Sequence, residues 1–177
     1  MKKGSIQTVL KATFKESNTF RTICEAIKDI ILDVNFIFHE NEVSLQAMDS
    51  SHVALCHMSL SKDKSFDFSC DSKVVIGVNL SSLCDILKCF DKKETIELKV
   101  NEKLETLDLE SKDKLFKMNL MDIEAEFLHI PKQEYNCSLE MDSKHFKTII
   151  TDLSKFTEQC EISCTQEQVT FSGCGNI

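Results

Sequence analysis

The sequence is poor in glycine and proline, with four glycines and one proline among its 177 residues. A serine hydrolase often presents its nucleophile on a glycine-rich turn, and a phosphate-binding loop needs glycines at fixed positions. Neither glycine pattern occurs in the chain. We therefore expect neither a nucleotide-binding loop nor a hydrolase built on such a turn.

Long apolar segments are lacking as well. No run approaches the roughly 20 residues that an apolar helix needs to cross a bilayer. The first residues include two lysines but no apolar stretch and no small-residue cleavage site, so we expect no signal peptide. These absences predict a protein of the cytosol or nucleus that makes no membrane contact.

The nine cysteines include no C-x-x-C pair. The two closest in sequence, Cys160 and Cys164, are not followed by a pair of histidines, which argues against a zinc site. The cysteines are scattered through apolar stretches, so we expect free, buried thiols in a reducing compartment. We predict no metal and no other cofactor.

The net charge of the chain is −8. A protein that binds nucleic acid over its whole surface is usually basic. Any contact with nucleic acid must therefore come from a local group of lysines and arginines, whose placement matters more than their number.

An internal repeat is the most informative feature. Residues 17–49 align with residues 143–175 without a gap at a constant offset of 126, so that Phe20 lies over Phe146 and Ile23 over Ile149. In each copy, apolar residues first recur at helical spacing, and two alternating segments then flank a polar turn. Each copy is therefore predicted to be a helix followed by a β-hairpin.

The predicted helices share a start signal and an apolar face. Each begins at a serine, Ser17 or Ser143, that could cap it. The apolar positions of the two faces are Phe20, Ile23, Cys24, Ile27 and Ile31 in the first copy, and Phe146, Ile149, Ile150 and Leu153 in the second.

A looser copy of the same unit lies at residues 80–110, where a helical stripe precedes two alternating segments. Two units then make one domain, and the fold class is α+β with antiparallel sheets. We predict a first domain at 1–119, a linker at 120–136 that holds the single proline, and the first half of a second domain at 137–177. The second domain is expected to be incomplete.

Basic residues recur on the polar faces of the predicted helices. They would contact phosphates without reading bases, which gives salt-sensitive, sequence-independent affinity. An ordinary solvated helix surface is the alternative for each of them. The residues are Arg21, Lys28, Lys88, Lys144, Lys147 and Lys155.

Residues 49–52, Asp-Ser-Ser-His, bring together the residue types of a hydrolase site. A catalytic triad needs side chains that converge in space. These four residues are consecutive after an alternating segment, and neighbouring side chains on extended backbone point to opposite faces. We expect no catalytic residue here, and a surface for docking is the other interpretation.

Three segments resemble, in order and spacing, the proliferating cell nuclear antigen family of eukaryotic DNA sliding clamps. They are LQAMDSSHVALCHMSL at 45–60, SCDSKVVIGVNLSSLCDILKCF at 69–90 and LMDIEAEFLHIPKQEYNC at 120–137. The resemblance runs from about residue 14 to residue 177, and roughly the last third of the family pattern is missing. It implies a DNA-clamp fold, in which helices line the inner face and sheets lie outside.

The resemblance also implies a function. Family members form a ring of three chains around double-stranded DNA, hold the DNA polymerase on its template, and dock replication and repair proteins. They are placed on DNA by a clamp loader and are not enzymes. The expected location is the nucleus, or a cytoplasmic replication site if the source is viral.

Residues that match the family's sites are implied to share their roles. Arg21, Lys28 and Lys88 would face DNA, whereas Asp85, Thr148 and Thr151 stand at positions that are usually basic. Lys144, Lys147 and Lys155 are then expected to compensate from the same helix.

The other implied sites are a peptide groove and a subunit contact. The groove would accept aliphatic and aromatic anchors at Met48, His52, Val53, Leu55, Leu128, Ile130 and Pro131. For each apolar residue among these, plain packing in the core is the alternative role. The subunit contact would use an edge strand that contains Leu115, Phe116 and Met118.

A second function stays open. A short clamp paralogue could act as an interaction or regulatory protein that keeps the groove or one ring edge but does not encircle DNA. Because the second domain looks incomplete, we do not expect this chain alone to close a stable ring. The mass in solution and retention on circular DNA would separate the two functions.

Overall fold

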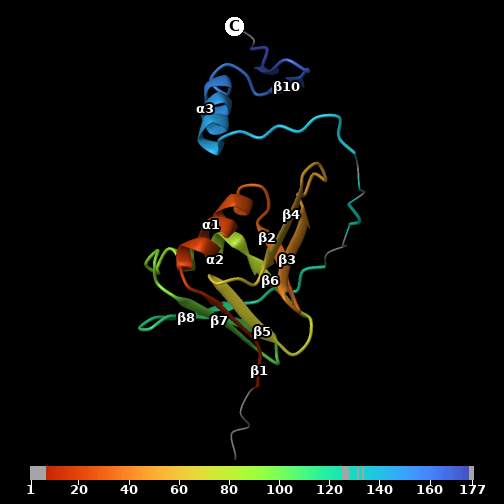
Figure 1. Cartoon of the computed structure of the whole chain (residues 1–177). Helices are drawn as coiled ribbons and strands as arrows, with labels where there is room; N and C mark the ends of the chain where they lie inside the picture. The colour runs from red at the N-terminus through yellow and green to blue at the C-terminus, as the bar shows by residue number, and fades with distance from the viewer. Residues whose placement is uncertain (1–6, 125–127, 131, 133, 176–177) are drawn as a thin grey trace, which may run out of the picture. The chain divides into compact units, whose positions relative to one another are not determined.

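The computed structural model describes residues 7–124, 128–130, 132 and 134–175 (Figure 1). The chain divides into two compact units, Met1–Leu128 and His129–Ile177. The division falls inside the predicted linker. Each unit is described by itself below.

The first unit contains two helices and nine strands among its described residues. The elements are β1 (Thr8–Phe14), α1 (Ser17–Lys28), β2 (Asp33–His39), β3 (Glu42–Met48), β4 (Leu55–Ser61), β5 (Phe66–Cys70), β6 (Val74–Asn79), α2 (Leu80–Leu87), β7 (Ile96–Asn101), β8 (Thr106–Glu110) and β9 (Leu115–Asn119).

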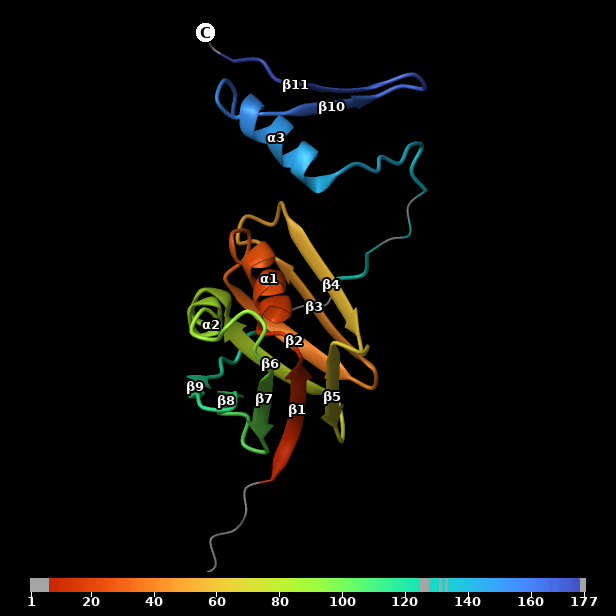
Figure 2. The same cartoon turned by 60° about the vertical axis from the view of Figure 1, so that its left-hand side comes forward.

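The strands form two antiparallel sheets. One has the order β5-β1-β7-β8-β9 and the other the order β4-β3-β2-β6, while α1 and α2 pack against each other (Figure 2). The predicted α+β class is confirmed. Alternation explains why the strands form where they do: in β2 the side chains of Val34, Phe36 and Phe38 are buried, and the residues between them are not.

The core of the first unit is rich in phenylalanine. The ring of Phe14 stacks on Phe20 of α1 and on Phe66 of β5, with centroid separations of 4.6 and 4.4 Å. Phe20 in turn lies 5.7 Å from Phe36 of β2. These rings join α1 to both sheets, so burial of the apolar face of α1 fixes the place of the helix.

The two sheets are made by an exchange between two halves of the unit. In the first half α1 lies between β1 and β2, and in the second half α2 lies between β6 and β7. The strand before each helix pairs with the strand after the other helix, so that β1 pairs with β7 and β6 with β2. Neither sheet can therefore be completed by one half alone.

The second unit repeats the start of this pattern. It contains α3 (Ser143–Leu153), β10 (Glu161–Cys164) and β11 (Val169–Ser172), and β10 pairs with β11. At the offset of 126 these elements fall on α1, β2 and β3, which confirms the helix-and-hairpin prediction for both copies. Their packing differs: Phe20 is 4% exposed, whereas its equivalent Phe146 is 41% exposed.

The predicted serine caps are wrong. The N-cap of α1 is Glu16, and Ser17 is buried, where its hydroxyl donates to the carbonyl oxygen of Asp91 at 2.8 Å. The N-cap of α3 is Asp142, whose carboxylate accepts from the backbone N–H groups of residues 144 and 145. In the first case a distant loop uses the serine hydroxyl, and in the second a carboxylate one residue earlier satisfies the helix start.

The cysteines are free, as predicted. The prediction that they are buried holds for Cys24 and Cys84, where burial raises the pKa of both thiols. It is wrong for five others: Cys89 lies on the exposed side of the chain just after α2, and the remaining four belong to the second unit, whose described residues include no buried side chain. The exposed cysteines are Cys89, Cys137, Cys160, Cys164 and Cys174.

Candidate functional site

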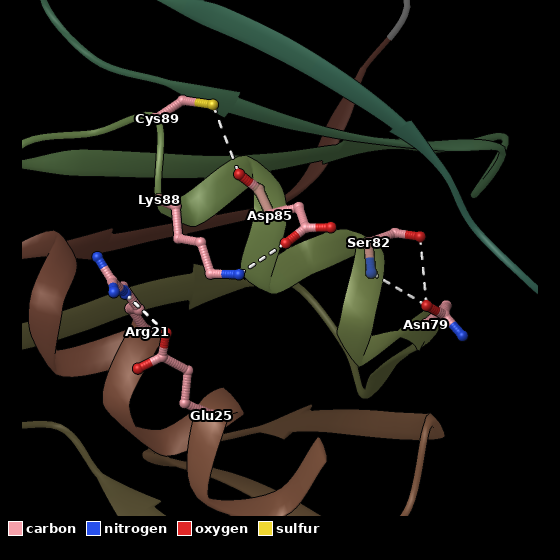
Figure 3. Close-up of polar contacts among 7 residues, drawn as sticks. All are labelled: Arg21, Glu25, Asn79, Ser82, Asp85, Lys88 and Cys89. Atoms are coloured by element: carbon pink, nitrogen blue, oxygen red, sulfur yellow. Dashed lines mark hydrogen bonds and ion pairs between the residues drawn. The ribbon is translucent and has the colours of Figure 1, made fainter. Parts of the chain in front are cut away.

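Charged side chains of α1 and α2 form a group that we call the α1–α2 charge cluster: Arg21, Glu25, Lys28, Asp85 and Lys88. Figure 3 shows Arg21 beside Glu25 on α1, and Asp85 beside Lys88 at the end of α2. The pair distances are 2.9 Å from Arg21 Nε to Glu25 Oε1 and 2.8 Å from Lys88 Nζ to Asp85 Oδ1.

The charges of the cluster act across the two helices. The hydrogen bond from Arg21 lowers the pKa of Glu25, and the positive charges of Lys28 and Lys88 lower it further. The hydrogen bond from Lys88 lowers the pKa of Asp85, and the same bond raises the pKa of Lys88. Each basic partner in these two pairs therefore already has a carboxylate beside it.

The other predicted basic residues belong to the second unit. Lys144 and Lys147 lie on α3 and are exposed. Lys155 follows the helix, and its Nζ lies 2.7 Å from Asp152 Oδ1. Thr148, at a position usually basic in the resembling family, donates its hydroxyl to the carbonyl oxygen of Lys144 at 2.9 Å.

A pocket of about 390 Å³ lies in the first unit, where β2, β3 and the start of β4 meet the linker. Four residues of the predicted groove line it: Met48, His52, Leu55 and Leu128. The structure thus brings Leu128 of the linker next to Met48, His52 and Leu55, which lie far earlier in the sequence.

Of the three other groove residues, Val53 and Ile130 are not among those that line this pocket. Val53 is 86% exposed. Ile130 belongs to the second unit and is 47% exposed. Pro131 lies outside the described residues.

Asp49 builds the loop that carries His52 into the pocket. Its carboxylate accepts from the backbone N–H groups of Val53 and Ala54, at 2.8 and 2.6 Å, and from both the N–H and the hydroxyl of Ser51. These hydrogen bonds lower the pKa of Asp49, with the Ser51 hydroxyl contributing most. Asp49 and Ser51 therefore do meet, because the chain turns here.

The expectation of extended backbone at residues 49–52 is accordingly wrong. The carboxylate of Asp49 closes a turn, and His52 has a φ of 57°, in the left-handed region. The contacts of Asp49 organise the loop rather than orient an imidazole.

Three contacts hold the linker against the outer face of the four-stranded sheet. The N–H of Met121 donates to the carbonyl oxygen of Gly77 at 2.8 Å. The side-chain amide of Asn35 donates to the carbonyl oxygen of Ile123 at 2.8 Å. Gln46 makes two hydrogen bonds with the backbone of Leu128.

Neither Asn35 nor Gln46 was predicted from the sequence as a contact of the linker. Alternation along β3 places Gln46 on the face opposite the buried Val43 and Leu45, where a polar residue is ordinary. Only the linker, 82 positions later, buries it. No local signal could have identified it.

The predicted subunit-contact residues lie on β9, at the edge of the five-stranded sheet. Leu115 is 55% exposed, and the ring of Phe116 lies 5.4 Å from Phe90. Met118 is buried in the core. The Met118 side chain is thus part of the core and Leu115 is exposed, while the predicted subunit contact itself stays a prediction.

The described part of the chain contains no group of three or more His, Cys, Asp or Glu side chains arranged to hold a metal ion. Within the same residues, no helix has the length and apolar character to cross a membrane.

Comparison with known proteins gives matches over nearly the whole chain. Residues 9–128 match the family described as "Proliferating cell nuclear antigen, N-terminal domain", and residues 129–177 match "Proliferating cell nuclear antigen, C-terminal domain". A "Proliferating cell nuclear antigen" from Chaetomium thermophilum is 34% identical over 175 residues, which cover 96% of this chain and 68% of that protein.

Proposed function

Because the chain belongs to the proliferating cell nuclear antigen family of sliding clamps and polymerase processivity factors, we propose that the α1–α2 charge cluster is its DNA-facing surface. Family membership supports the sliding-clamp function itself, whereas the alternative of a non-encircling regulator has no support of its own. The assignment of the cluster rests on one observation: two packed helices, one from each half of the first unit, place Arg21, Lys28 and Lys88 in a single electrostatic group.

The chemistry of the cluster suits a surface that slides. Lysine and arginine contact phosphates without reading base edges, so their affinity is independent of sequence. The pairing of Arg21 with Glu25 and of Lys88 with Asp85 moderates this attraction. Lys144, Lys147 and Lys155 would add phosphate contacts from the second unit.

The pocket beside His52 is the proposed docking site for polymerase and other client proteins. Apolar side chains of Met48, Leu55 and Leu128 supply contact area, and pockets of this kind hold aliphatic and aromatic anchors. On the family resemblance alone, we propose that Val53, Ile130 and Pro131 also belong to the peptide groove.

The free edge of β9 is the proposed subunit contact in a ring of three copies. An edge strand can pair with a strand of a neighbour, and a head-to-tail contact of this kind can close into a ring. A clamp loader would place the ring on DNA. We further propose that the protein works in the nucleus as a scaffold that catalyses no reaction, and that residues 120–136 link its two domains.

Loading on circular DNA tests the function. The chain is incubated with clamp loader, ATP and nicked circular duplex DNA, and its mass is measured with and without DNA. The sequence alone did not lead us to expect ring closure by this chain, but family membership favours a trimer that is retained on the circle and released when the DNA is cut. A chain that stays monomeric and is never retained would contradict the encircling function and favour the regulatory alternative.

A substitution tests the docking site separately. Met48→Glu puts a charge into the pocket and should abolish binding of a synthetic peptide with an aliphatic and an aromatic anchor. Val75→Glu, on the exposed surface of β6 outside the pocket, is the control. Unchanged peptide binding by Met48→Glu would refute the assignment of the pocket.

A further inference from the structure

Gln46 is one of two buried polar or charged residues among the described residues, with 7% of its surface exposed. Both ends of its amide are used by one residue of the linker. Its Nε2 donates to the carbonyl oxygen of Leu128 at 2.9 Å, and the N–H of Leu128 donates to its Oε1 at 2.6 Å. A two-point contact fixes both the distance and the rotation of the Leu128 backbone relative to β3.

The location of this contact connects it to the pocket. Gln46 and Met48 are two positions apart on β3 and therefore point to the same face of the sheet. Gln46, Met48 and Leu128 all line the same cavity. The amide of Asn35 holds the linker at Ile123, so Gln46 supplies the second side-chain anchor, at the point where Leu128 enters the wall.

The amide group is required at this place for a chemical reason. Leu128 presents one donor and one acceptor to β3, and a glutamine side chain offers the matching acceptor and donor. An apolar side chain of similar length would leave both backbone groups unpaired next to the sheet, and a buried unpaired group is costly. The linker would then lose its fixed position.

We propose that Gln46 is a positioning residue for partner binding: it holds Leu128 in place so that the linker wall of the pocket is formed before a peptide arrives. This inference rests on the proposed docking function of the pocket. A wall that is already in place spares the partner the entropic cost of ordering it. Gln46 itself need not touch the peptide.

Two substitutions separate this role from simple packing. Gln46→Met keeps the length of the side chain and removes both hydrogen bonds. Gln46→Glu keeps the shape of the side chain but changes its hydrogen-bonding groups. One oxygen of an ionised glutamate can accept from the Leu128 N–H, whereas the other faces the Leu128 carbonyl oxygen and cannot donate to it. A protonated glutamate can donate to that carbonyl, so acid restores the original pattern.

The measurement is the affinity of the full chain for a synthetic peptide with an aliphatic and an aromatic anchor, by calorimetric titration at pH 7.5 and pH 5. We expect Gln46→Met to bind about tenfold more weakly at both values. Gln46→Glu should bind weakly at pH 7.5 and approach the wild type at pH 5. Asp33, His52 and Glu124 also line the pocket, so each affinity is divided by that of the wild type at the same pH.

Hydrogen exchange at the Leu128 amide gives a readout that does not depend on the peptide. It should be faster in Gln46→Met and, at pH 7.5, in Gln46→Glu, while amides of Phe36 and Phe38 in the neighbouring strand keep their protection. Gln166→Met, at an exposed turn of the second unit, is the matched control and should change neither measurement.

The outcomes are distinguishable. If Met48→Glu abolishes binding but Gln46→Met binds like the wild type, the positioning role is wrong and the docking site stands. If neither substitution affects binding, the docking site itself is wrong. If Gln46→Met fails to fold, the test depends on Gln46→Glu. This variant should regain peptide affinity at pH 5, and a loss of affinity at pH 7.5 without that recovery would overturn the proposal.

Discussion

Arg21 and Glu25 lie one turn apart on α1 and share a hydrogen-bonded ion pair of 2.9 Å between Nε and Oε1. Asp85 of α2 and Lys88, the C-cap of that helix, form a similar pair three positions apart. In both pairs a base proposed to face DNA already has an acidic partner on its own helix. A phosphate must therefore compete with a carboxylate for the same donor, which limits how strongly the helices can hold DNA.

Removal of the carboxylate from Glu25 should accordingly increase affinity for DNA. In Glu25→Gln the Arg21 guanidinium keeps a neutral neighbour and gains attraction for phosphate. We expect binding of short duplex DNA to rise roughly two- to fivefold at low salt, because exposed ion pairs are weak and screened. Fluorescence anisotropy of labelled duplex over a series of salt concentrations measures this change.

Glu110→Gln is the matched control for that experiment. Glu110 pairs with Lys99 on the five-stranded sheet, away from the two helices, and the substitution changes the net charge by the same amount. Equal gains in the two variants would mean that net charge, rather than the α1–α2 charge cluster, governs DNA binding.

Gly77→Ala should loosen the start of the linker. A Cβ at this position would overlap the carbonyl oxygen of Met121 and lie 3.1 Å from Ile123 Cδ1. Because the obstacle includes backbone, the linker must move away, and the hydrogen bond from the Met121 N–H to Gly77 weakens. We expect faster hydrogen exchange at Met121 and several-fold weaker binding of the anchor peptide.

Val75→Ala on the same strand adds no atoms and serves as the reference for that variant. If the Met121 amide exchanges at the same rate in Gly77→Ala, in Val75→Ala and in the wild type, the close approach of the linker to β6 is not present in solution.

Asp49→Asn should flatten the dependence of stability on pH. The hydrogen bonds to its carboxylate lower the pKa of Asp49 in the folded protein below the usual value of 3.8. Folding therefore favours the ionised form, so its contribution is complete above that value and is lost as pH falls through the lower, folded pKa. Urea midpoints measured from pH 6 to pH 2 should fall more steeply for the wild type than for Asp49→Asn.

Asp63 offers an internal check on this reasoning. Its carboxylate accepts from the hydroxyl and N–H of Ser65 and from the N–H of Phe66, and these bonds also lower its pKa. Asp63→Asn should change the pH profile in the same direction. Parallel profiles for the wild type and both variants would show that these turns do not form in solution.

Phe14→Ala should be among the most destabilising single changes in the first unit. The ring is 1% exposed and stacks against both Phe20 and Phe66, so its removal leaves a cavity between α1 and the five-stranded sheet. We expect a loss of about 3–5 kcal/mol in the free energy of unfolding, measured by urea titration.

Phe156→Ala provides the comparison, because this ring in the second unit is 62% exposed. Its effect should stay within about 0.5 kcal/mol. A loss of similar size in both variants would argue against the Phe14 cluster as the centre of the core.

The repeat made much of the fold predictable. Alternation in β2 and the apolar stripe of α1 are local patterns, and the offset of 126 transferred them to β10 and α3. The relation of Gln46 to Leu128 and that of Ser17 to Asp91 were not predictable, because each joins a polar side chain to backbone far away in the sequence. Local patterns identify which face is apolar, but they do not identify the distant partner of a polar group.

The candidate sites likewise contain some features that the sequence could predict and others that it could not. Met48, His52 and Leu55 follow one another closely, so their meeting in one pocket could be anticipated from the resemblance. The carboxylates beside Arg21 and Lys88 could have been found from the spacing of charges along a helix, since residues three or four apart are neighbours. The turn at Asp49 could not, because its hydrogen bonds depend on a backbone conformation that alternation misrepresents.

The exchange of strands between the two halves of the first unit also governs how this unit can be synthesised. When β1, α1 and β2 leave the ribosome, β6 and β7 have not yet been made. The edge of β1 that later pairs with β7, and the edge of β2 that later pairs with β6, are then unpaired. Pairings between segments so distant in sequence form slowly, and open edges invite contact with other chains in the meantime. Neither β1 nor β2 can complete its pairing until β6 and β7 have emerged, so the first unit matures late and as a whole.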